Sequence, residues 1–337
     1  MQYCSARSIS TDPFRAGLEI GKALAPHCPE VVLLFASISY EPDFSDFFEA
    51  LYSELGSREV IVFGGTGDGI YERSGAENYG VSALGINSEK KVKWSTRIEF
   101  GVGVDSEAAA RKCAQGLAPV DSTNNAFCMV LADGAKADGH RIVAGLSGVL
   151  PIAYFGGLTA DDRRFTHSEV FLNGKEYEDA VIILLGEGEM GFAFNAASGW
   201  SPCGMKGVVE EVEGNQIRRI SGQTAQAFMA KELGKPLSEA DVGVVPLAAY
   251  QQRSDHFFLR TPSRLHPNTG AVSTFGSIEA GTEVRVCTAT RPDILRAVED
   301  ATQGLARDTI SFEPKAAIII SCAGRKWLLA DAGENEL

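Results

Sequence analysis

A repeated strand that ends in a pair of glycines constrains the fold of this chain more than any other feature. Phe63-Gly64-Gly65 and Phe155-Gly156-Gly157 lie 92 residues apart, and each follows an apolar strand and a helical segment. Self-similarity at this spacing is typical of a duplicated folding unit rather than of a solenoid turn. Because glycine has no Cβ, each pair also lets the backbone approach another group closely.

A matching helix precedes each repeated unit, and the pattern starts a third time near the C-terminus. Helix starts with capping residues are predicted at Thr11-Asp12-Pro13, at Asp105-Ser106-Glu107 and at Thr290-Arg291-Pro292-Asp293. An apolar strand follows each helix, and in the third copy that strand is predicted at 316–322. The chain reaches Leu337 before a third glycine-pair strand arrives, so we expect two complete units and an unfinished third.

These elements predict a mixed α/β fold of internally duplicated strand-helix units with mixed sheets and hairpins, followed by a smaller C-terminal α/β domain. A boundary is expected near residue 222, because Ser221-Gly222-Gln223-Thr224 offers caps for a new helix. The first domain is expected over 1–221, with repeat units at about 1–98 and 99–186 and a hairpin at 187–221, and the second domain over 222–337. Within the second repeat unit, strands are expected at 97–104 and 151–156.

Charge and composition exclude several classes of partner. The chain has 31 Lys and Arg against 44 Asp and Glu, a formal net charge of −13, so it should repel nucleic-acid backbones and anionic lipid. Its apolar runs are too short to span a bilayer, and its N-terminus has no signal-peptide core. Seven cysteines without a Cys-x-x-Cys pair or a zinc-type spacing are typical of a reducing compartment. We expect a soluble cytoplasmic protein without metal or cofactor.

Several motifs in a fixed order resemble those of the FIST sensory domains of prokaryotic signalling proteins. No motif is specific by itself, but their order over about 290 residues is. The motifs are Leu34-Phe35-Ala36-Ser37, Phe63-Gly64-Gly65-Thr66-Gly67-Asp68-Gly69, Phe155-Gly156-Gly157, Phe171-Leu172-Asn173-Gly174, Gly199-Trp200-Ser201-Pro202-Cys203-Gly204, Gly214-Asn215-Gln216-Ile217 and Ser321-Cys322-Ala323-Gly324-Arg325.

This resemblance implies a bacterial sensor of small ligands, with amino acids the usual suggestion. It also implies an output partner such as a histidine kinase, a diguanylate cyclase or a chemoreceptor. Asp68 stands where the family more often has glutamate. Family members continue past the Cys-x-Gly-Arg segment into another glycine-glutamate loop that this chain does not reach, so we expect the second domain to be truncated and part of the site to be missing.

The two glycine loops are the expected walls of a ligand site, because crevices beyond the carboxyl ends of strands are the usual ligand sites of such sheets. Loop amides or the guanidinium groups of Arg163, Arg164 and Arg325 would bind a carboxylate, and an aspartate would bind an ammonium group. The residues expected at the site are Gly64, Gly65, Thr66, Asp68, Gly156, Gly157, Thr159, Asp161, Cys203, Ser321, Cys322 and Arg325.

Other interpretations remain open on the sequence. The glycines could simply turn the chain, with solvated aspartates beside them. Gly65-x-Gly67-x-Gly69 is a weak match to a dinucleotide fingerprint, because no helix is predicted directly after it. Cys203 or Cys322 could be the nucleophile of a hydrolase or amidotransferase-like enzyme with His167 as base. A scaffold that binds only protein is the third class, and a non-enzymatic sensor is the leading prediction.

Overall fold

The computed structural model describes residues 1–117, 120, 126–251, 254–309 and 312–329. These residues divide into two compact units, which are described separately below. The first unit comprises Met1–Phe194 together with Asp308–Ile320, and the second comprises Asn195–Arg307 and the segment that starts at Ser321. In the described part of the chain, no helix has both the length and the apolar character needed to cross a membrane.

The first unit contains the same arrangement of elements twice. The first copy consists of β1 (Gln2–Ser8), α1 (Pro13–Leu24), β2 (Val31–Ser37), α2 (Phe44–Leu55), β3 (Ile61–Gly67), β4 (Ile70–Glu72), β5 (Gly75–Glu77) and β6 (Val81–Asn87). The second consists of β7 (Val92–Phe100), α3 (Val102–Gln115), β8 (Ala126–Ala132), α4 (Gly139–Ser147), β9 (Phe155–Leu158), β10 (Val170–Leu172), β11 (Lys175–Tyr177) and β12 (Ala180–Gly188). The strand orders β1-β6-β2-β3 and β7-β12-β8-β9 are equivalent, which confirms the predicted duplication.

Among the described residues of each copy, the one parallel pair joins the two strands that flank the second helix. β2 runs parallel to β3, and β8 runs parallel to β9. In both copies the remaining neighbours are antiparallel. The carboxyl ends of the parallel strands therefore lie at one edge in each sheet, where ligand sites of such sheets are usually found.

The hairpin of the second copy pairs with the sheet of the first. β10 lies antiparallel to β3, with Val170 opposite Gly65 and Leu172 opposite Phe63. This extends the first sheet to β1-β6-β2-β3-β10-β11, whereas the equivalent hairpin β4-β5 forms a separate two-stranded sheet. The two copies are therefore joined by main-chain hydrogen bonds as well as by packing.

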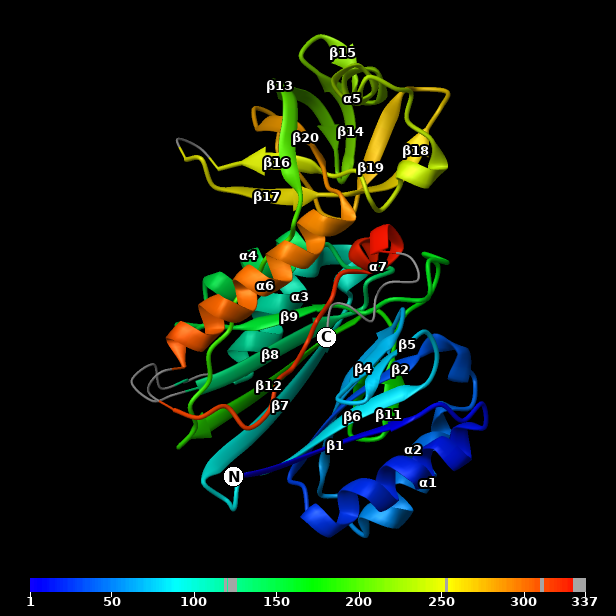
Figure 1. Ribbon diagram of the computed structural model, residues 1–337, viewed down its shortest axis with the longest axis vertical. Helices are drawn as coiled ribbons and strands as arrows, with labels where there is room; N and C mark the ends of the chain where they lie inside the picture. The colour runs from blue at the N-terminus through cyan, green and yellow to red at the C-terminus, as the bar shows by residue number, and fades with distance from the viewer. Residues whose placement is uncertain (118–119, 121–125, 252–253, 310–311, 330–337) are drawn as a thin grey trace. The chain divides into compact units, whose positions relative to one another are not determined.

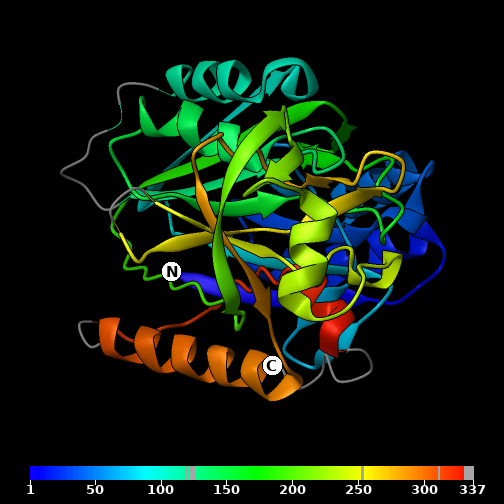
Figure 2. The same cartoon turned by 90° about the horizontal axis from the view of Figure 1, so that it is seen from above.

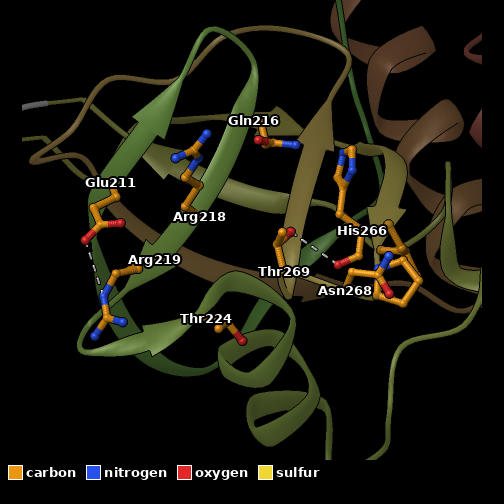
Figure 3. Close-up of a pocket in the computed structure, with 10 residues that line it drawn as sticks. Glu211, Gln216, Arg218, Arg219, Thr224, His266, Asn268 and Thr269 are labelled. Atoms are coloured by element: carbon orange, nitrogen blue, oxygen red, sulfur yellow. Dashed lines mark hydrogen bonds and ion pairs between the residues drawn. The ribbon is translucent and has the colours of Figure 1, made fainter.

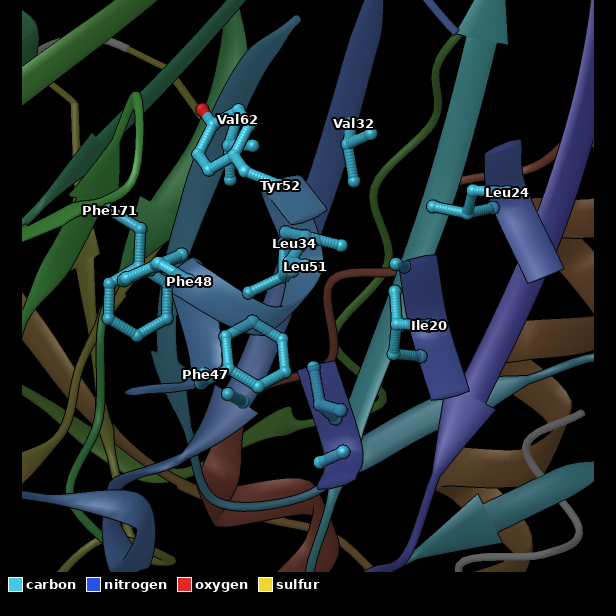
Figure 4. Close-up of a cluster of buried hydrophobic side chains, with 14 of the residues drawn as sticks. Ile20, Leu24, Val32, Leu34, Phe47, Phe48, Leu51, Tyr52, Val62 and Phe171 are labelled. Carbon is cyan, nitrogen blue, oxygen red and sulfur yellow. The ribbon is translucent and has the colours of Figure 1, made fainter. Parts of the chain in front are cut away.

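The inner strands of the two larger sheets of the first unit are buried on both faces. Val32 and Leu34 of β2 pack toward α1 and α2, while Val31 and Leu33 face the core shared with the second sheet. Figure 1 shows α1 and α2 along one face of the first sheet, and Figure 4 shows the side chains that fill the space between them. Because both faces are covered, these strands are continuous apolar runs rather than alternating ones.

Side-chain caps position the helices that precede and follow these strands. The Asp12 carboxylate accepts a hydrogen bond from the Arg15 amide at the start of α1, as predicted from its capping motif. Asp138 does the same for α4 by accepting from the amides of His140 and Arg141. Gly56 ends α2 in the left-handed conformation, which glycine adopts without steric cost.

The second unit is a curled antiparallel sheet with three helices among its described residues. The elements are β13 (Ser201–Glu213), β14 (Gln216–Ile220), β15 (Gln223–Thr224), α5 (Ala225–Leu233), β16 (Leu247–Tyr250), β17 (Phe257–Arg260), β18 (Pro262–His266), β19 (Ala271–Thr274), β20 (Glu283–Thr288), α6 (Arg291–Asp308) and α7 (Ala323–Leu329). β13 pairs with β20 along its first half and with β14 along its second, and Figure 2 shows its curvature. Phe228 and Met229 of α5 are buried in this curl.

Three of the predicted strands differ from the structure. Residues 316–322 form no regular strand: Ile318 packs on the core between the two sheets of the first unit, while Ile319 and Ile320 are 47% and 45% exposed. An apolar run alone does not make a strand, because a strand needs a neighbour for its hydrogen-bond ladder. The strand predicted at 97–104 ends at Phe100, and Gly101 caps α3. The one predicted at 151–156 begins only at Phe155.

Candidate functional site

The first glycine of each pair lies against the neighbouring parallel strand. A Cβ on Gly64 would stand 1.6 Å from the Leu34 carbonyl oxygen, and one on Gly156 would stand 1.7 Å from that of Val130. Gly64 is opposite Leu34 and Gly156 opposite Val130 in the two parallel ladders. At these two positions, the missing Cβ lets the glycine backbone pack against the neighbouring strand rather than against a ligand.

The loops that follow the two glycine strands are in direct contact. A Cβ on Gly65 would lie 2.4 Å from Cγ2 of Thr159. The Ala160 amide donates to the Thr66 carbonyl at 3.0 Å, and the Asp162 amide donates to Oδ1 of Asp68 at 2.8 Å. A Cβ on Gly157 would instead lie 3.3 Å from Cγ2 of Ile320.

Buried polar side chains connect these loops to the next segment of the chain. Thr66 donates its amide to the Glu169 carbonyl at 2.9 Å and accepts the Glu169 amide on its hydroxyl at 3.1 Å. The Thr159 hydroxyl lies 3.0 Å from that of Ser168, which donates to the Asp133 carboxylate at 2.7 Å. The ends of β3, β8 and β9 therefore meet in one hydrogen-bonded region, which we call the strand-end junction.

Asp161 holds a strained loop at this junction. Its carboxylate accepts the amides of Phe165, Thr166 and His167 at 2.9, 2.7 and 3.0 Å. Burial acts to raise the pKa of Asp161, but these hydrogen bonds outweigh it and keep the pKa below its ordinary value. Asp162, Arg163 and Phe165 within the same loop have φ values of 55°, 66° and 55°, which few non-glycine residues adopt.

A cluster of acids around one histidine lies at the base of the same loop. From Nε2 of His167, Oε1 of Glu169 is 3.2 Å away and Oε1 of Glu41 is 3.3 Å away. From Nδ1, Oε2 of Glu178 is 3.4 Å away, and that carboxylate pairs with Lys136 at 2.7 Å. Glu169 is only 5% exposed, and its Oε2 has no hydrogen-bond partner among the described residues.

The electrostatics of this cluster follow from burial and from mutual proximity. Burial raises the pKa of Glu169 to about 7, although the neighbouring imidazole acts to lower it. Burial acts to lower the pKa of His167, but Glu41, Glu178 and Glu169 outweigh it and the pKa is raised. From the sequence, His167 is predicted only as a base for a catalytic cysteine. His167-x-Glu169 ahead of a buried strand was the available signal, whereas Glu41 is too distant in sequence to be linked to it.

Two family models together cover most of the chain. The FIST N domain matches residues 30–223, and the FIST C domain matches residues 216–337. The chain belongs to the FIST family. FIST domains are sensory domains of signal transduction, so the chain carries the input side of a signalling system. No curated protein matches it.

Four of the predicted site residues belong to the second unit of this FIST protein. Cys203 is half-buried in β13, and Cys322 is exposed just before α7. Arg325 donates from Nη1 to the Ala197 carbonyl at 2.9 Å. Ser321 is half-buried. The strand-end junction belongs to the first unit.

The second unit has a surface cavity of about 530 Å³ beside β14, shown in Figure 3. Arg218 pairs with Glu213, and Arg219 lies 3.7 Å from Glu211. The cavity is lined by Glu211, Gln216, Arg218, Arg219, Thr224, Leu265, His266, Pro267, Asn268 and Thr269. Its arginines are compensated by carboxylates, so it offers less net charge than its composition suggests. This cavity is not among the sites predicted from the sequence.

Proposed function

We propose that this FIST protein senses a small polar metabolite, of the amino-acid class, at the strand-end junction. The observation that carries the proposal is the loop after Asp161, in which three non-glycine residues adopt left-handed φ values. Such conformations each cost on the order of 1–3 kcal/mol and concentrate at ligand clamps and switches. The loop lies where both repeats end their parallel strands, which is the usual ligand position in sheets of this kind.

The charges around the loop suit an amino acid. Arg163 and Arg164 are exposed on it and carry the planar guanidinium groups that bind carboxylates in a bidentate manner. Asp68 and Asp162 stand on the two facing loops and offer carboxylates for an ammonium group. A ligand held by both loops would favour one loop arrangement by its differential affinity, and that shift in population would be the signal.

We further propose that the signal passes to an output protein or domain such as a histidine kinase, a diguanylate cyclase or a chemoreceptor, and that sensing takes place in the cytoplasm. In this proposal the chain is a binding module rather than an enzyme. Turnover of any amide or ester that is lost on replacing Cys203 and Cys322 by serine would favour the enzyme instead.

A calorimetric and thermal-shift screen against the amino acids tests the proposal. Asp68→Asn is the informative variant, because asparagine keeps the acceptor for the Asp162 amide and removes only the negative charge. We expect a ligand that raises the melting temperature of the wild type and whose Kd rises at least tenfold in Asp68→Asn. Asp46→Asn on the exposed face of α2 is the matched control and should bind as the wild type does. Failure of every amino acid to bind at millimolar concentration would overturn the proposal.

A further inference from the structure

We infer that Glu41, His167 and Glu169 form a binding site for a first-row divalent metal ion of the Zn²⁺ type. One nitrogen and two carboxylate groups present their ligand atoms within 4.8 Å of one another. The three residues come from the segment after β2 and from the segment that leads into β10. This inference does not rest on the metabolite proposed above, although the cluster lies at the base of the same loop.

The distances between the donors match the edges of a metal polyhedron. Zn–N and Zn–O bonds are about 2.0–2.2 Å long, so two ligand atoms of a tetrahedral zinc ion stand about 3.3–3.5 Å apart. Nε2 of His167 is 3.2 Å from Oε1 of Glu169 and 3.3 Å from Oε1 of Glu41. The two distances from Nε2 therefore match edges of such a polyhedron, and all three ligand atoms lie within 4.8 Å of one another.

The buried oxygen of Glu169 provides a second, separate reason. A carboxylate oxygen removed from water without a partner is costly, and such groups in native structures require an explanation. Oε2 of Glu169 is in this state among the described residues, on a side chain that is only 5% exposed. A cation bound in the cluster would provide the missing interaction, by charge or as a second ligand bond.

The other ring nitrogen of His167 is also arranged as in a metal site. Ligating histidines usually donate their second N–H to a carboxylate, which sets the tautomer and the ring orientation. Here Nδ1 faces Glu178 at 3.4 Å, and Glu178 is itself held by Lys136 at 2.7 Å. In the tautomer that carries its proton on Nδ1, the lone pair of Nε2 faces Glu41 and Glu169. Glu178 is thus a positioning residue rather than a ligand.

The donor set selects the class of ion. Imidazole nitrogen suits zinc and its first-row neighbours, whereas Mg²⁺ and Ca²⁺ prefer oxygen donors alone. Three protein ligands leave a position for water or for a small molecule, as in open zinc sites. Because His167 also ends the loop held by Asp161, a bound ion would tie that loop to the segment after β2.

Metal binding to the full-length protein after chelator treatment and dialysis tests the inference. We expect one Zn²⁺ per chain by calorimetry, no comparable binding of Mg²⁺, and a visible absorption band of low-coordinate Co²⁺ when cobalt replaces zinc. Glu169→Gln and His167→Gln should each weaken Zn²⁺ binding at least tenfold, and Glu178→Gln should weaken it about tenfold. Circular dichroism of the metal-free variants shows whether they fold.

Two controls distinguish this site from incidental binding. His27 and Cys28 are adjacent and exposed, so they are the most plausible adventitious zinc ligands in the described part of the chain. His27→Gln should keep the stoichiometric ion, and so should Glu49→Gln on the exposed face of α2. The inference is overturned if the folded His167→Gln variant binds Zn²⁺ as the wild type does, if His27→Gln alone removes the ion, or if the wild type shows no binding and no cobalt band.

Discussion

Replacing Gly64 by alanine should destabilise the first unit strongly, because there is no space for a methyl group. The new Cβ would stand 1.6 Å from the Leu34 carbonyl oxygen, whereas real Cβ contacts essentially never fall below 3.0 Å. β3 is held between β2 and β10, and Gly64 is buried between them. The strand would have to move by about 1.4 Å, which is enough to break the neighbouring ladder hydrogen bonds.

The expected loss follows from that displacement. Two lost ladder bonds cost about 1 kcal/mol each, and the disturbed packing on both buried faces adds about 1–3 kcal/mol. We therefore expect a loss of about 3–5 kcal/mol in unfolding free energy, or about 10 °C in melting temperature for a unit of this size. Urea unfolding followed by circular dichroism, with the melting temperature from calorimetry, measures both quantities.

Two further alanine substitutions make this test specific. Gly156→Ala meets the Val130 carbonyl at 1.7 Å, and the φ of 156° at this position adds backbone strain for alanine. Because β9 is an edge strand and can move outward, the steric part should be smaller than at Gly64, and we expect a total loss of similar size. Gly148 ends α4 at a φ of −81°, and a Cβ added there would have no described atom within 4 Å. The unfolding free energy of Gly148→Ala should therefore stay unchanged or rise by about 0.5 kcal/mol. The reasoning is refuted if Gly64→Ala melts within 2 °C of the wild type.

Two other predictions concern ionisable groups. Burial acts to raise the pKa of Glu72, but hydrogen bonds from Ser5 and Ser74 outweigh it and hold the pKa at about 2. The stabilising contribution of this carboxylate is therefore complete above about pH 4.5 and is lost as the pH falls toward 2. NMR titration should show the low pKa, and Glu72→Gln should flatten the profile of stability against pH across that interval. Burial raises the pKa of Cys113 and of Cys128 to about 12, so iodoacetamide at pH 8 should modify exposed Cys28 and Cys322 while mass spectrometry finds both buried thiols unmodified. An ordinary glutamate pKa at Glu72 would contradict the first prediction. Rapid alkylation of Cys128 in the folded protein would contradict the second.

Much of the architecture could be predicted from local patterns. The capping motif at Asp12 and the apolar runs of β2 and β8 are short-range signals, and the structure agrees with them. The glycine pairs are also a short-range signal. The sequence predicted that they face a ligand, whereas in the structure Gly64 and Gly156 lie against the neighbouring strands. The strand predicted at 316–322 was wrong, because an apolar run does not specify whether a neighbouring strand is available.

The sequence by itself determined that the chain is duplicated, where most of its helices begin, and that it belongs with FIST sensory domains. Only the tertiary structure decided that β10 pairs with β3, and that Glu41 meets His167 and Glu169 more than 120 residues away. Local periodicity reflects which face of an element is buried. The meeting of distant side chains depends instead on how the loops close over the strand ends, and no single segment encodes that closure.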